Sequence, residues 1–311
     1  MMKDEQRILI AIDGSEQAFD AVRYVSYMFP QEKTKIVLFH VNAEVPESFL
    51  DLRRDALFQS NVIQITAWSL QIKKNIEEFM EKALNILLDA GFPRDSISIK
   101  IQGKKIGIAR DILKESHEGY SAIVLGRSGI SRLKDIIMGS IANKLLGKTQ
   151  HIPLAVIGGL PETNKIIIGF DASEGAMKAV HSISSLMASP KREIMLCHVI
   201  RPLGVHVGIR GLFNDNEENE WIEKNIKEIE PFFDKAINIL VSGGFSRENV
   251  HKNILKGKKS RAEAVTRKAE GDGYGTIAVG RRGLTIVEEF VIGRVSTKVL
   301  HLADEMAVWV I

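Results

Sequence analysis

The second half of the chain repeats the first. Residues 165–174 read KIIIGFDASE and match RILIAIDGSE at residues 7–16, which places Asp171 opposite Asp13. The repeat unit is about 150 residues, far longer than the 20 to 50 residues of a solenoid repeat. Each copy is therefore long enough to be a domain. We place the boundary in the glycine- and proline-containing segment near residue 160, which predicts domains at 1–160 and 161–311.

Within each copy, short apolar runs alternate with longer segments of helical period. This alternation is typical of an α/β domain in which helices cover a parallel sheet. In the first copy the runs predict five strands, at 7–12, 35–41, 96–101, 122–125 and 154–157. Helices are predicted at 15–28, 65–90, 106–115 and 140–146, with Ser15 as the cap of the first. The predicted fold class is α/β, with two tandem five-stranded parallel-sheet domains.

The longest predicted helix of each copy carries apolar residues at spacings of three and four, which places them on one face. We interpret them as packing positions and not as a cofactor site. In the first copy they are Ile72, Ile76, Phe79, Ala83, Ile86 and Leu87. In the second copy the equivalent residues are Asn225, Ile229, Phe232, Ala236, Ile239 and Leu240.

Composition narrows the classes of function. The net charge is +3, from 42 basic and 39 acidic residues, without the concentrated basic stripe that nucleic-acid binding needs. No apolar stretch is long enough for a membrane span and no signal peptide is found, which predicts a cytoplasmic protein without a membrane partner. Cys197, the one cysteine, excludes an internal disulfide and is predicted to be a small buried side chain. HExxH, nucleophile-elbow and GxGxxG patterns are also missing from the sequence.

A glycine pattern follows the fourth predicted strand of each copy. Glycines let the main chain approach a ligand, and the start of a helix offers unpaired N–H groups to an anion. In a parallel sheet the carboxyl ends of the strands meet at one edge, where a carboxylate suits ribose, an apolar strand end suits a base and a glycine loop suits phosphate. The first copy offers Asp13, Val41, Gly126, Arg127, Gly129, Gly139, Ser140 and Ile141. The second offers Asp171, Val199, Gly280, Arg281, Gly283, Gly293, Arg294 and Val295.

Several of these residues also have a purely structural interpretation. A glycine at a strand-to-helix turn is often there for geometry alone, and Asp13 is placed to cap the helix that begins near Ser15. His40 and His198 lie inside repeated strands without a carboxylate or serine partner at a suitable spacing. We interpret both as packed residues with satisfied rings, so no catalytic residue is assigned.

Asp13, Val41 and the spacing Gly126-x2-Gly129-x9-Gly139-Ser140 resemble the ATP-binding branch of the universal stress protein family. The likeness extends over both copies. It implies a strand order of 3-2-1-4-5, a base held by the main chain at Val41, and ribose near Asp13 and Gly126. Phosphates are implied at Gly129, Gly139, Ser140 and Ile141. The resemblance further implies that the two copies pair through their last strands as a pseudo-dimer within the chain, and that two chains can associate as a homodimer.

The second copy departs from this pattern at Arg294, which stands where the first copy has Ser140. Either Arg294 pairs with phosphate as a planar donor, or its long side chain occupies the pocket. Asp171 and Val199 are retained. We therefore expect the first copy to bind nucleotide better than the second.

The resemblance implies a regulator of the stress response that binds an adenine nucleotide, ATP or AMP, with Mg or Mn accompanying the triphosphate. Occupancy would set its conformation or its binding of a protein partner that the sequence does not identify. Two alternatives stay open: a slow metal-dependent ATP hydrolase or nucleotidyl or phosphoryl transferase, and a nucleotide-free interaction scaffold. No residue that could activate water is found, so any ATPase activity is expected to be weak.

Overall fold

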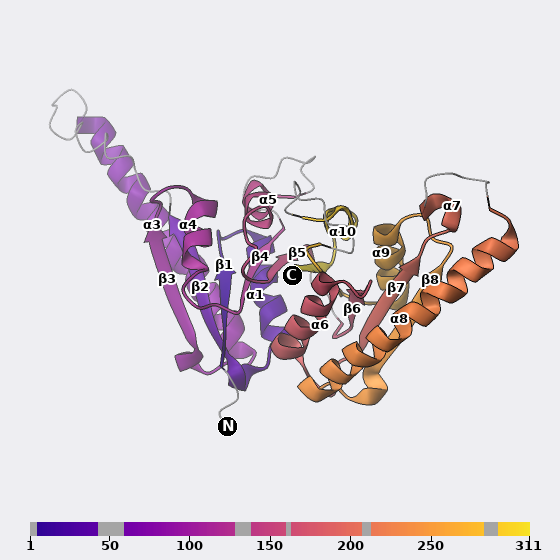
Figure 1. Cartoon of the computed structure of the whole chain (residues 1–311). Coiled ribbons are helices and arrows are strands. Elements are labelled where there is room, and N and C mark those ends of the chain that lie inside the picture. Colours follow the sequence, from indigo (N-terminus) through magenta and orange to yellow (C-terminus); the bar gives the residue numbers. More distant parts are fainter. Residues whose placement is uncertain (1–4, 43–58, 128–137, 160–162, 207–212, 283–291) are drawn as a thin grey trace.

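The computed structural model describes residues 5–42, 59–127, 138–159, 163–206, 213–282 and 292–311 (Figure 1). The elements of the first half are β1 (Gln6–Ala11), α1 (Glu16–Met28), η1 (Gln31–Lys33), β2 (Thr34–Asn42), α3 (Gln59–Asp89), η3 (Arg94–Ser96), β3 (Ile97–Gly103), α4 (Ile108–Glu115), β4 (Ala122–Gly126), α5 (Ser140–Leu146) and β5 (Leu154–Ile157). Those of the second half are β6 (Ile166–Gly169), α6 (Glu174–Met187), β7 (Ile194–Ile200), α7 (Leu203–His206), α8 (Asp215–Gly243), η4 (Arg247–Asn249), β8 (Val250–Lys256), α9 (Arg261–Asp272), β9 (Thr276–Val279), α10 (Arg294–Leu302) and β10 (Ala307–Val310).

All five strands and all four helices predicted for the first half are present. β5 and α5 have the predicted bounds, whereas α3 begins earlier than expected, at Gln59. Ser15 is the cap of α1, because its hydroxyl accepts a hydrogen bond from the Ala18 amide at 3.2 Å. Periodicity thus predicted the elements, and the differences are confined to their ends.

The strands of both halves form one ten-stranded sheet in the order β3-β2-β1-β4-β5-β10-β9-β6-β7-β8. Within each half the neighbouring strands are parallel, and the local order is the expected 3-2-1-4-5. The halves meet where β5 and β10 pair antiparallel, with Leu154 opposite Val310. The predicted pairing of the two last strands within the chain is therefore confirmed.

Helices cover both faces of this sheet (Figure 1). Alternate residues of β1 point to opposite faces, so that Ile8 and Ile10 lie in one core cluster and Leu9 in the other. α1, α3, α6 and α8 contribute to the first cluster, and α4, α5, α9 and α10 to the second. Both faces of the sheet are therefore buried, as expected for parallel strands with nearly continuous apolar sequences.

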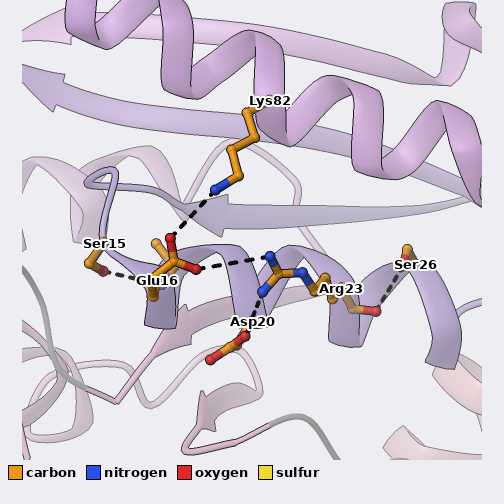
Figure 2. Close-up of polar contacts among 7 residues, drawn as sticks. Ser15, Glu16, Asp20, Arg23, Ser26 and Lys82 are labelled. Carbon is orange, nitrogen blue, oxygen red and sulfur yellow. Dashed lines mark hydrogen bonds and ion pairs between the residues drawn. The ribbon is translucent and has the colours of Figure 1, made fainter.

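The first turn of α1 is held by charged groups on its outer side (Figure 2). Glu16 Oε1 lies 3.5 Å from Lys82 Nζ on α3, and Asp20 Oδ1 accepts a hydrogen bond from Arg23 Nη1 at 2.8 Å. Glu16 Oε2 also lies 3.9 Å from Arg23 Nη2. These pairs are exposed or half-buried, so each contributes little stability; the Glu16–Lys82 pair is the one that joins α1 to α3.

One predicted packing position on α8 is wrong. Phe232 is 44% exposed, whereas its counterpart Phe79 packs against the core; the next residue, Phe233, is buried, as is its own counterpart Met80. In the first half Phe79 packs over Gly14, where an added Cβ would lie 2.7 Å from the Phe79 ring. The second half has Ala172 at the position of Gly14, and this methyl group leaves no such room.

Candidate functional site

The register of the strands brings three predicted site positions of the first half to one level. Ala11 of β1 pairs with Phe39 of β2 on one side and with Leu125 of β4 on the other. Asp13 lies two residues after Ala11, Val41 lies two residues after Phe39, and Gly126 directly follows Leu125. These ends lie at the point where the order of strands reverses, and ligands of doubly wound sheets bind there.

The described ends of the glycine pattern, Gly126 and Gly139, lie at the same edge. The Gly139 amide donates to the Arg127 carbonyl at 2.8 Å, which fixes the start of α5 against the end of β4. Gly126 has a structural requirement of its own, because an added Cβ would lie 2.5 Å from the carbonyl oxygen of Gln17. Gly129 and its counterpart Gly283 lie outside the described residues. Ser140 is exposed at the first position of α5, and Gly139 provides no side-chain cap.

Asp13 supports the turn into α1. Its Oδ1 accepts a hydrogen bond from the Ser15 amide at 3.0 Å, and Ser15 in turn caps the helix. Asp171 repeats this contact in the second half, with its Oδ1 3.1 Å from the Ser173 amide. The helix caps are therefore Ser15 and Ser173 and not the aspartates, and one oxygen of each aspartate carboxylate holds the amide of the capping serine.

His40 and His198 tie two strand ends together. The His40 Nδ1–H donates to the Ile12 carbonyl at 2.7 Å, and the His198 Nδ1–H donates to the Phe170 carbonyl at 2.8 Å. Burial lowers the pKa of each imidazole, against the opposing effects of that hydrogen bond and of the nearby aspartate. Both rings are thus packed and hydrogen-bonded, as the sequence predicted, and the lowered pKa favours the neutral imidazole.

The second half has the same framework with different side chains. Gly169 pairs with Cys197 and Val279, which puts Asp171 and Val199 at one level. Arg294 is the first residue of α10 and is exposed. Ser296, which the sequence analysis missed, has a buried hydroxyl that donates to the Gly280 carbonyl at 2.6 Å. Its signal was the Ser-Thr pair just beyond Arg294, but this hydroxyl supports the strand end and does not replace that of Ser140.

Arg127 and Arg281 have side chains committed to the interface between the halves. Arg127 donates through Nη1 to the Leu300 carbonyl at 2.6 Å and through Nη2 to the Ala303 carbonyl at 2.5 Å, at the end of α10. Arg281 donates to the Leu146 carbonyl at 2.6 Å, at the end of α5. Burial lowers the pKa of Arg281 to about 10, so it stays charged at neutral pH.

This reciprocal capping corrects the assignment of both arginines as nucleotide contacts through their side chains. Cations stabilise the carboxyl ends of helices, where carbonyl groups lack partners. Sequence offers no way to see that a residue of one glycine loop serves the helix of the other copy. Only the main-chain groups of Arg127 and Arg281 remain to line the candidate sites at the strand ends.

Three remaining expectations concern metals, membranes and the cysteine. Among the described residues, no three His, Cys, Asp or Glu side chains are grouped so that they could hold a metal ion. In the same part of the chain no helix is both long and apolar enough to cross a bilayer. Cys197 is buried, and burial raises the pKa of its thiol to about 12, which confirms its interpretation as a small core side chain.

The fold and site define the class of the protein as a tandem pair of doubly wound α/β domains, each with its strand ends and the glycine that precedes a helix, Gly139 or Gly293, at the switch point. The model of the universal stress protein family matches residues 5–157 and 162–311, and the chain belongs to that family.

Individual relatives agree with this assignment. Universal stress protein YxiE of Bacillus subtilis is 26% identical over 153 residues, which cover 45% of this chain and 90% of the relative. Universal stress protein MJ0577 of Methanocaldococcus jannaschii is 26% identical over 168 residues, covering 49% of this chain and 94% of that protein. A universal stress protein from Archaeoglobus fulgidus has a similar fold over 99% of this chain and 96% of its own, with a TM-score of 0.60 and 17% identity.

Proposed function

We propose that the chain binds an adenine nucleotide, ATP or AMP, at the strand ends of its first half, and that occupancy sets its conformation or its choice of protein partner in a stress response. The observation that carries this proposal is the convergence of Asp13, Val41 and the start of α5 at one switch point. Membership of the universal stress protein family supports it. A cytoplasmic location and association of two chains are part of the same proposal.

The residues of the first half fit the parts of a nucleotide. The main chain at Val41 suits the edge of a base, and the Asp13 carboxylate suits ribose hydroxyls. Ser140 and Ile141 supply main-chain amides at the start of α5, and Ser140 adds an exposed hydroxyl; both kinds of donor are suited to phosphate oxygens, while Gly139 turns the chain into the helix. Mg or Mn would come with the triphosphate and neutralise part of its charge.

A first experiment is to denature the purified protein and to identify and quantify by mass spectrometry any nucleotide that it releases. About one adenine nucleotide per chain would support binding at the first half alone, and about two would support binding at both halves. The result that overturns the proposal is no released nucleotide together with no calorimetric response to ATP or AMP in the presence of Mg. The nucleotide-free scaffold would then replace it.

A variant series assigns the site within the first half. The double substitution Gly139→Ala with Ser140→Ala should weaken nucleotide binding by at least tenfold, because it removes a hydroxyl donor and crowds the main chain. Gly147→Ala is the matched control at the other end of α5, where the nearest atom to an added Cβ is 3.7 Å away. Equal affinity of the double variant and the control would show that the glycine loop is not the binding site.

A further inference from the structure

The strand ends of the second half are surrounded by arginines that the first half lacks. They are Arg201 after β7, Arg261 at the start of α9, Arg282 after β9 and Arg294 at the start of α10. Their sequence counterparts in the first half are Ala43, Ile108, Ser128 and Ser140. Within the described residues none of the four arginines forms an ion pair with a carboxylate. Two carboxylates of this edge, Asp171 and Glu218, accept hydrogen bonds from main-chain amides instead of forming ion pairs with these arginines.

Hydrogen bonds hold these elements against one another. Lys298, one turn after Arg294 on α10, donates through Nζ to the Ser260 hydroxyl at 3.2 Å, immediately before Arg261. At the end of β7, Arg201 donates through Nη2 to the Val205 carbonyl at 2.9 Å, and Trp221 Nε1 donates to the Arg201 carbonyl at 3.0 Å. The Lys298 contact thus joins α10 to the start of α9, and the bonds of Arg201 fix the chain that leaves β7.

Asp171, the counterpart of the proposed ribose ligand Asp13, lies near two of these arginines. Burial and the nearby Arg201 lower the pKa of Arg261, and Asp171 acts in the opposite direction, so all three groups share one neighbourhood. The Nε atoms of Arg201 and Arg261 are buried and have no hydrogen-bond partner. In dinucleotide-binding doubly wound folds a carboxylate binds the ribose 2′-hydroxyl. Where the ligand carries a phosphate at that position, a nearby arginine accommodates it.

A second difference between the halves concerns an internal carboxylate. In the first half Asp111 is buried and accepts hydrogen bonds from the amides of Lys105, Ile106 and Gly107, the shortest at 2.9 Å. The second half has Ala264 at this position. In the described part of the second half, no carboxylate accepts from the corresponding amides of residues 258–260. In the first half the Asp111 carboxylate therefore occupies the position next to the amides that precede α4. In the second half Ala264 replaces this carboxylate, and Arg261 stands at the start of α9.

We infer that the strand ends of the second half bind a nucleotide that carries a second phosphate on its ribose 2′ or 3′ hydroxyl. Arg201 and Arg261 contact this second phosphate, and Arg282 and Arg294 lie toward the 5′-phosphate. This inference rests on the proposed function, because it takes the strand ends to be nucleotide sites. It assigns the two halves different ligands: a nucleotide with free ribose hydroxyls in the first and a ribose-phosphorylated nucleotide in the second. Arg294 then contacts the 5′-phosphate at the position where the first half has Ser140.

Isomers of one nucleotide provide the test. Adenosine 3′,5′-bisphosphate and adenosine 2′,5′-bisphosphate carry two phosphates, as ADP does, but the second phosphate is on the 3′ or 2′ hydroxyl and not on the 5′-phosphate. By titration calorimetry, one of the bisphosphates should bind at about one site per chain and at least tenfold more tightly than ADP. ATP, which carries more phosphate than either isomer, serves as the control for simple charge. This site should persist in the Gly139→Ala, Ser140→Ala double variant, which removes the proposed site of the first half.

Two substitutions locate the binding. Arg261→Ile introduces the residue of the first half, and Ala264→Asp introduces its internal carboxylate. Each should weaken bisphosphate binding by about tenfold to a hundredfold, because each removes or neutralises a charge-assisted hydrogen bond. Arg267→Ile is the matched control on the same helix, where Arg267 pairs with Glu263 at the surface. Circular dichroism of each variant checks that it is folded, and Ala264→Asp retains every arginine if Arg261→Ile does not fold.

The outcomes separate the inference from the proposed function. Equal affinities for ADP, ATP and both bisphosphates, or bisphosphate binding that survives both substitutions, would overturn the inference while leaving ATP binding by the first half intact. Bisphosphate binding without any ATP or AMP binding would overturn the proposed function of the first half and keep the second site. Absence of all nucleotide binding would overturn both.

Discussion

The two halves share one framework and differ where that framework ends. Their strand orders, aspartates and histidine contacts correspond position by position, so the residues that build and join the strands have been retained. At the strand ends, Ser140 and Asp111 of the first half correspond to Arg294 and Ala264. A duplicated domain can keep its core and change its ligand, because the side chains that pack the sheet and those that line its edge are different residues.

The interface between the halves is also unequal, although it forms around an approximate symmetry. Tyr24 of the first half accepts a hydrogen bond from Trp309 Nε1 of the second at 2.8 Å and lies 3.1 Å from the Thr276 hydroxyl. The counterparts of these three residues are Ser182, Ala155 and Ala122. Two first halves would lack the tryptophan and two second halves would lack the tyrosine, so the interface favours pairing of unlike halves.

The largest expected effect is at this unequal interface. Trp309→Ala should lower the free energy of unfolding by about 3–5 kcal/mol, because it empties a fully buried position and removes a partner of Tyr24. Urea denaturation followed by circular dichroism measures the change. Trp68→Ala is the matched control, since Trp68 is 55% exposed on α3 and its loss should cost less than about 0.5 kcal/mol. Similar losses for the two variants would show that the interface contributes little to stability.

A smaller effect is expected from the two capping arginines. Arg127→Ala should cost about 2–3 kcal/mol and Arg281→Ala about 1–2 kcal/mol, because each leaves buried carbonyl groups without a charged donor. Arg127 makes two short bonds, whereas the second contact of Arg281, to the Thr149 hydroxyl, is 3.5 Å long. Urea denaturation of both variants gives the order. A larger loss of the free energy of unfolding for Arg281→Ala than for Arg127→Ala would contradict the conclusion that Arg127 is the stronger cap.

The sequence predicted the fold well because each element has a local signal. Strands such as β5 are uninterrupted apolar runs, and α1 begins at a serine that caps it. The pairing of β5 with β10 followed from the family resemblance and is confirmed. The error at Phe232 arose because the packing of its counterpart Phe79 depends on a residue far away in sequence, Gly14, which the second half replaces with Ala172.

The candidate site could be predicted only in part for the same reason. Asp13, Val41 and Gly139 each follow a recognisable strand or precede a recognisable helix, so the sheet brings them together. Arg127 and Arg281 also stand in the glycine pattern, but their partners are carbonyl groups of the opposite half. No spacing rule relates a guanidinium to a main-chain oxygen more than a hundred residues away.

The smallest expected effect concerns the two histidines and depends on pH. Burial lowers the pKa of His40 and His198 below the ordinary value of 6.5, so the unfolded chain takes up these protons before the folded chain does. The free energy of unfolding should therefore fall as the pH decreases below about 6.5 and should be insensitive to these groups above it. His198 is 8% exposed and His40 is less buried, so we expect the second half to contribute more of this dependence.

Substitution of each histidine separates the two contributions. His198→Gln and His40→Gln remove the titrating group while keeping a side chain that can donate to the neighbouring carbonyl. Urea denaturation between pH 5 and pH 8 should give a flatter pH profile for both variants, and the flatter of the two should be that of His198→Gln. A profile unchanged by either substitution would mean that the imidazoles are protonated equally easily in the folded and unfolded chains. Their interpretation as neutral donors that tie the strand ends together would then fail in both halves.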